Sequence, residues 1–181
     1  MVNKASEADY ALLVQKSQEF NDAYPITREW RRSPFNWLLT LAPGTRGAIA
    51  RRMVEEWVAA LGLSAHQMTD HRQRYVVVEG KRIQVKFSTL WNNGEYRFQQ
   101  IRDQDYDYVL CLGISPDDVH TWLIPKDEML EHLRGRAGQH TGAGAHETYW
   151  ISVAPAGGEP WLADYGNQLS DVRELLLSLG R

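Results

Sequence analysis

The stretch that decides the fold is YVVVEGKRIQVKF, residues 75–87. It holds two β-rich runs joined at Glu79-Gly80, a pair suited to a tight turn, and so predicts a β-hairpin. Side chains alternate between the two faces of a strand. Gln84 and Lys86 are therefore expected on the same face of the second strand.

Helices and further strands flank this hairpin. Pro43-Gly44 is expected to end the short helix that precedes it. Thr45 is then expected to cap the clearest helix, whose apolar side chains recur at helical spacing. The expected elements are helices at 7–21, 34–39, 46–61, 126–134 and from Ser170 onward, and strands at 107–113, 119–124 and 149–153, with 96–101 either helical or extended. This mixture predicts an α/β fold with one central mixed β-sheet flanked by helices.

The chain has 181 residues, a length that fits a single domain. Within it we expect an N-terminal helical arm at 1–44, a core at 45–134, and a C-terminal part at 135–181. This last part consists of a glycine-rich loop (135–147), the late strand and the final helix.

Composition narrows the class of protein. Hydrophobic residues make up 43% and charged residues 24%, as in ordinary globular proteins. The net charge of −3 argues against a strong, sequence-blind nucleic-acid binder, but it leaves room for a local basic cleft. Cys111 lies in an apolar run and is expected to be a buried thiol. Without a signal peptide or a membrane span in the sequence, we expect a cytoplasmic protein.

Part of the chain is similar to a known superfamily. The helix at 46–61, the hairpin ending in Gln84-Val85-Lys86, and the segment from Tyr96 through two strands to Lys126 resemble PD-(D/E)XK, or restriction-endonuclease-like, nucleases in a variant with a QxK motif. The similarity covers roughly half of the chain. It implies the restriction-endonuclease-like form of the α/β fold, and a Mg²⁺-dependent endonuclease that hydrolyses DNA phosphodiester bonds.

The resemblance also implies a site. In such enzymes acidic residues hold Mg²⁺, which neutralises the phosphate and lowers the pKa of a bound water, and a lysine lies beside that water. Lys86 matches the lysine, and Gln84 replaces an acid with a weaker, neutral ligand. The partner strand should supply an acid across from Gln84, near Tyr75, but residues 73–75 contain none. The nearest upstream acid is Asp70, which a bend after residue 71 could bring back.

The acid usually supplied by the helix is also displaced, because its place holds Ala50 and Arg51. Glu55 or Glu56 could take over as a metal ligand, or Glu55 could simply form an exposed pair with Arg51. The expected catalytic residues are Lys86, Gln84, Asp70 and Glu55, and the expected metal ligands are Asp70, Gln84 and Glu55.

Cationic and amide side chains concentrate around these positions. Arginine and glutamine bind phosphates and base edges, so they predict a surface that faces double-stranded DNA. The expected DNA-binding residues are Arg51, Arg52, Arg72, Arg74, Gln99, Gln100 and Arg102. The alternative is that these residues lie on solvent-exposed loops and helix faces and do not contact DNA.

Three interpretations remain open at this stage. The first is an active Mg²⁺-dependent nuclease, for which a homodimer is plausible because cutting both strands usually requires two sites. The second is a catalytically degenerate, DNA-binding member of the same fold. The third is a protein-interaction subunit that uses its tryptophans as anchors.

Overall fold

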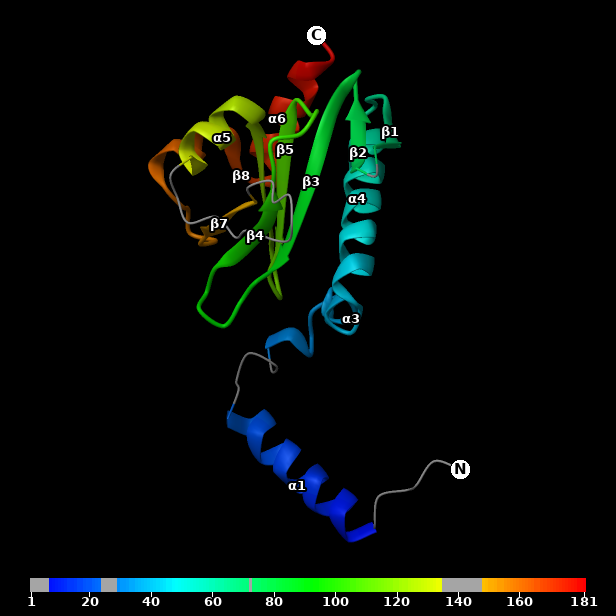
Figure 1. Cartoon of the computed structure of the whole chain (residues 1–181), viewed down its shortest axis with the longest axis vertical. Helices are drawn as coiled ribbons and strands as arrows, with labels where there is room; N and C mark the ends of the chain where they lie inside the picture. The colour runs from blue at the N-terminus through cyan, green and yellow to red at the C-terminus, as the bar shows by residue number, and fades with distance from the viewer. Residues whose placement is uncertain (1–6, 24–28, 72, 135–147) are drawn as a thin grey trace.

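The computed structural model describes residues 7–23, 29–71, 73–134 and 148–181 (Figure 1). Arg72 and the glycine-rich loop at 135–147 therefore lie outside the described residues. Among the helices within the described ranges, none combines the length and apolar character that a membrane span requires.

A six-stranded mixed sheet forms the centre of the fold, in the order β1-β2-β3-β5-β6-β8. Its strands are β1 (Ala65–Asp70), β2 (Gln73–Val78), β3 (Lys81–Thr89), β5 (Tyr108–Ile114), β6 (Val119–Pro125) and β8 (Gly166–Gln168). β3 and β5 run parallel, and every other neighbouring pair is antiparallel. The predicted α/β class with a mixed central sheet flanked by helices is confirmed.

Two long helices cover one face of this sheet. These are α4 (Pro43–Ala60) and α6 (Leu169–Leu179), with the short α3 (Asn36–Leu39) beside them. They bury Val54, Val58 and Leu176 against Ile83 and Leu110 of the strands. Each such side chain contributes about 1.5–3 kcal/mol when it is fully buried, so this core anchors α4 to the hairpin.

The opposite face carries a second apolar core. It is covered by a two-stranded sheet of β4 (Tyr96–Ile101) and β7 (Tyr149–Val153), by α5 (Lys126–Leu133) and by a short 3₁₀ helix, η1 (Pro160–Tyr165). Tyr96 and Phe98 of β4 pack here against Trp122 of β6. Cys111 also lies in this core with 1% exposure, which confirms the buried thiol. In Figure 1, β4 and β7 lie on the side of the sheet opposite α4.

The hairpin has the register that its sequence predicts. Val78 lies opposite Lys81, and Val76 lies opposite Ile83. Glu79 and Gly80 both have positive φ, 48° and 79°, as a two-residue turn that follows the twist of the strands requires. Within the described residues the β2–β3 ladder ends at the Val76–Ile83 pair. Beyond it, β3 continues with β5 as its partner (Figure 1).

Four local expectations are wrong or incomplete. Thr45 does not cap α4, which begins at Pro43 with Ala42 as its N-cap residue, because a proline at the first helical position has no need of an N–H. The last helix is capped by Gln168 and Asp171, not by Ser170. β1 was not expected, since its sequence AHQMTD lacks the β-branched alternation of a typical strand. Segment 96–101, predicted as either helical or extended, is a strand.

The N-terminal helix α1 (Glu7–Ala23) has the expected extent, but it buries little. Tyr10, Leu13 and Phe20 are each more than 60% exposed. These apolar side chains therefore add nothing to either core.

Gly113 offers a test of the second core. A Cβ placed on this residue would lie 2.7 Å from the ring of Tyr96, which is fully buried and whose hydroxyl is 2.8 Å from Nδ1 of His120. The ring has no room to move, so Gly113→Ala should destabilise the fold by about 1–3 kcal/mol in urea unfolding.

Gly44→Ala is the matched control, because a Cβ there meets nothing within 4 Å and alanine favours helix. Equal unfolding midpoints for Gly113→Ala and the wild type would contradict this account of the packing.

Candidate functional site

A row of polar side chains runs along β3 on the face opposite α4. Arg82, Gln84, Lys86 and Ser88 occupy alternate positions, while Ile83 and its alternates face the apolar core. The row faces β4 and the loop at 102–107, to which its members hydrogen-bond. The predicted placement of Gln84 and Lys86 on one face is confirmed.

Lys86 is held by a backbone carbonyl. Its Nζ donates to the main-chain oxygen of Gln100. β4 carries an irregularity between Phe98 and Ile101, and Gln100 there has a positive φ of 57°. Such bulges redirect a strand locally, and this one presents the Gln100 carbonyl to the lysine.

Burial and neighbouring cations lower the pKa of Lys86 to about 8. Removal from water is the largest cause, and the positive charges of Arg102 and Arg51 add to it, while the nearby Cys111 acts in the opposite direction. The Cys111 thiol itself stays protonated, since burial raises its pKa to about 12. Lys86 therefore lies in a region of excess positive charge.

Gln84 is only 6% exposed. Its Nε2 donates to the side-chain oxygen of Gln104 at 3.0 Å, which ties β3 to the loop above it. Its Oε1 is buried and has no hydrogen-bond partner among the described residues. This buried oxygen is therefore an unused acceptor, among the described residues, that a cation could use.

Asp70 is engaged elsewhere. The chain reverses after β1, with His71 at φ 43°, so that Asp70 pairs with Gln73 across the ladder. The chain therefore turns here, but the turn pairs Asp70 with Gln73 of β2, whereas Gln84 belongs to β3. The carboxylate lies 3.4 Å from Nη1 of Arg82, and the same guanidinium also binds Asp105. An arginine thus occupies the position beside Asp70 that a metal ion would need.

Glu55 is also committed to a structural contact. Its two carboxylate oxygens accept from the backbone N–H and the side-chain amide of Gln67, at 3.2 and 2.6 Å, which ties α4 to β1. Glu56 is exposed.

These residues do not fit a Mg²⁺ site. Mg²⁺ requires several oxygen ligands about 2.1 Å away in octahedral geometry. Asp70 and Glu55 are bound to protein donors, and the positive charges of Arg102 and Arg51 act on Lys86. In the part of the chain that the structure describes, no three His, Cys, Asp or Glu side chains gather in a way that could hold a metal.

Among the described residues, no carboxylate forms an ion pair with Arg51, Lys86 or Arg102. Arg51 of α4 and Arg102 both lie near enough to Lys86 to lower its pKa. The Nε of Arg51 and the Nε of Arg102 are buried, without an acceptor among the described residues. Burial, and then the charge of Arg74, lower the pKa of Arg51. We call Arg51, Lys86 and Arg102 the cation cluster.

The other predicted DNA-binding residues lie around this cluster or away from it. Arg74 is exposed on β2, near Arg51. Gln99 and Gln100 line a cavity beside β3, and Arg52 is exposed on α4. Arg72 falls outside the described residues.

Arg46 belongs to a group of basic residues in the first half of the sequence that could face DNA, and it lines two cavities beside β3 together with Trp91 and Arg97, which were not predicted as site residues. Trp91 was not among the residues expected to bind DNA. No local sequence pattern predicts that these three residues lie together, because they come from α4, the β3–β4 turn and β4 and meet only in the folded chain.

Comparison with known proteins bears on the fold. No protein-family model matches the chain, and no curated protein sequence matches it either. Among solved structures, a bacterial homing endonuclease, I-Ssp6803I, is similar with a TM-score of 0.50 and 18% sequence identity. The alignment covers 77% of this chain and 94% of the endonuclease chain. At this identity the likeness shows a shared, nuclease-like fold.

The pKa of Lys86 can be measured directly. Reductive methylation with carbon-13 should give one dimethyl-lysine resonance that titrates near pH 8, well below the ordinary lysine value. Lys86→Arg should remove that resonance and leave the others unchanged. If every lysine resonance titrates near pH 10, the described burial of Lys86 among cations is wrong.

Proposed function

We propose that this chain is a DNA-binding protein built on an endonuclease-like fold, and that the cation cluster binds a backbone phosphate of double-stranded DNA. The observation that carries the proposal is the charge of the site. Arg51, Lys86 and Arg102 converge on β3, while Asp70 and Glu55 are held by protein donors.

The cost of burying unpaired charge supports an anionic ligand. A buried cation without a partner is unfavourable, and so is a buried donor without an acceptor. The Nε–H groups of Arg51 and Arg102 are such donors among the described residues. A phosphate would supply several oxygen acceptors and negative charge together, and charge-assisted hydrogen bonds of this kind are strong.

The surroundings of the site favour DNA over a small anion. Arg74 and Gln99 extend the polar surface beyond the cluster, and a phosphate backbone offers repeated contacts along such a surface. The similar solved structure is described as a homing endonuclease, a protein that acts on DNA by its name.

Catalysis by the same site is the second candidate, because two observations favour it. The buried Oε1 of Gln84 is an unused acceptor, and Lys86, with a pKa of about 8, is partly neutral near physiological pH. A Mg²⁺-dependent endonuclease would then nick plasmid DNA in Mg²⁺ or Mn²⁺ but not in EDTA, and Lys86→Ala would abolish the nicking. We expect no metal-dependent nicking.

Loss of one cluster residue should weaken DNA binding. Lys86→Ala, Arg51→Ala and Arg102→Ala should each reduce duplex affinity roughly tenfold in fluorescence anisotropy, because a hydrogen bond to a charged group contributes about 1.5 kcal/mol or more. Each variant should also lower the slope of log affinity against log salt by about 1.

Arg173→Ala is the matched control, since it removes an exposed arginine on α6, outside the cluster. A protein without salt-dependent duplex binding, or one in which Arg173→Ala weakens binding as much as Arg51→Ala, would contradict the proposal.

The pKa of Lys86 also predicts how affinity depends on pH. Below pH 8 the lysine is charged and attracts phosphate, and above pH 8 the free protein loses that charge. Duplex affinity should therefore fall as pH rises from about 7 to 9. Lys86→Arg should flatten this dependence, because arginine stays charged throughout. An equal fall in both proteins would assign the effect to another group.

A further inference from the structure

Two adjoining cavities extend from the cation cluster along β3. The nearer one, of about 370 Å³, is lined by Ser88, Gln99 and Gln100 among others, and the Gln100 carbonyl binds Lys86. The farther one, of about 650 Å³, lies where the β3–β4 turn faces α3 and α4. The two share Arg46, Thr89, Trp91 and Arg97 as lining residues, so they form one continuous path away from Lys86.

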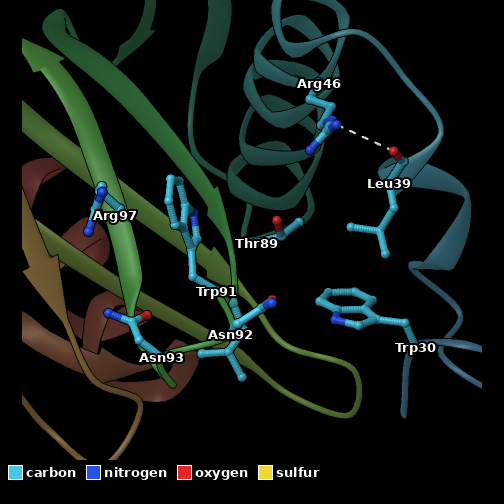
Figure 2. A pocket seen from close by; sticks show the side chains of 9 residues that line it. Trp30, Leu39, Arg46, Thr89, Trp91, Asn92, Asn93 and Arg97 are labelled. Atoms are coloured by element: carbon cyan, nitrogen blue, oxygen red, sulfur yellow. Dashed lines mark hydrogen bonds between the residues drawn. The ribbon is translucent and has the colours of Figure 1, made fainter. Parts of the chain in front are cut away.

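Trp91 forms a fixed aromatic wall of the larger cavity. Its ring is 43% exposed, and the guanidinium of Arg97 lies over it at 4.4 Å from the centroid. Arg97 is itself held on its other side by Trp150, at 4.8 Å. In Figure 2, Arg97 lies on one side of Trp91, and Thr89 and Trp30 lie on the other. The guanidinium of Arg97 thus covers one face of the indole and also lines the cavity, while Thr89 and Trp30 line the cavity on the other side of the ring.

Polar groups border the same space. Two carbonyls fix Arg46, whose Nε donates to Leu41 at 2.8 Å and whose Nη2 donates to Leu39 at 3.3 Å. Asn92 is exposed at the rim (Figure 2), while Asn93 is tied down by Glu95. The cavity thus offers a flat aromatic surface, a positioned guanidinium and an amide within one space.

We propose that this cavity binds one unstacked nucleobase of the DNA whose phosphate lies on the cation cluster, an inference that rests on the proposed function. A nucleobase has a π-face that stacks on an indole, and its edge carries donors and acceptors that suit amide and guanidinium groups. The volume of about 650 Å³ is within the usual range for small-ligand sites. Arg97 also favours base binding, because a cation over one face of the indole holds the ring in place before the base arrives.

The test compares two labelled probes of the same sequence, a fully paired short duplex and one that carries a single unpaired adenine. The wild type should bind the probe with the unpaired base more tightly, by roughly 5- to 150-fold, which corresponds to about 1–3 kcal/mol for one stacked base. Trp91→Ala should abolish this preference while it retains affinity for the paired duplex. Trp91→Phe should keep part of the preference.

Trp150→Ala is the matched control, since Trp150 also contacts Arg97 but does not line the cavity. It should preserve most of the preference. Equal affinity of the wild type for both probes, or a preference that survives in Trp91→Ala, would overturn the base-binding inference and leave the phosphate proposal standing. A wild type that binds neither probe would overturn both, so the two failures are distinguishable.

Discussion

The parallel pairing of β3 with β5 is the constraint on which the rest of the structure depends. It runs over seven positions, from Ile83–Tyr108 to Thr89–Ile114, and holds β3 beyond the point where its ladder with β2 ends. Because strand side chains alternate, this pairing sends Ile83 toward the helices and Gln84 and Lys86 toward β4. Both cores and the polar row follow from it. So does the burial of Lys86, which lies opposite Cys111 in the register.

The site on this strand has the opposite charge from the one that the superfamily resemblance implies. Where acids would surround a metal, Arg51 and Arg102 lie near Lys86, and Arg82 forms ion pairs with Asp70 and Asp105. Cations that repel one another in a partly buried space destabilise the fold, but they prepare a site for phosphate without any need for a metal. The scaffold and the lysine are consistent with DNA as the ligand, while the surrounding charges favour binding over hydrolysis.

The features that were predicted correctly from the sequence are those that interactions between neighbouring residues control. The turn at Glu79-Gly80 set the hairpin register, and the apolar stripe of 46–61 placed α4 against the sheet. The sequence could not predict the partners of the acids, because these depend on tertiary contacts. Gln67 reaches Glu55 only through the unexpected strand β1, and Arg82 reaches Asp70 across the β1–β2 reversal. The backbone bulge at Gln100 and the seating of Arg97 between two tryptophans likewise have no local signature.

The central claim is that the cation cluster holds a phosphate and that no metal binds beside Gln84. The most direct measurement is NMR of the nitrogen-15-labelled protein, observing the Nε–H groups of Arg51 and Arg102 and the side-chain amide of Gln84. A short DNA duplex should shift both arginine signals, and Mn²⁺ should broaden the Gln84 amide no more than that of Gln15, which lies on α1. Selective broadening of Gln84 by Mn²⁺, with no response of the arginines to DNA, would contradict the account.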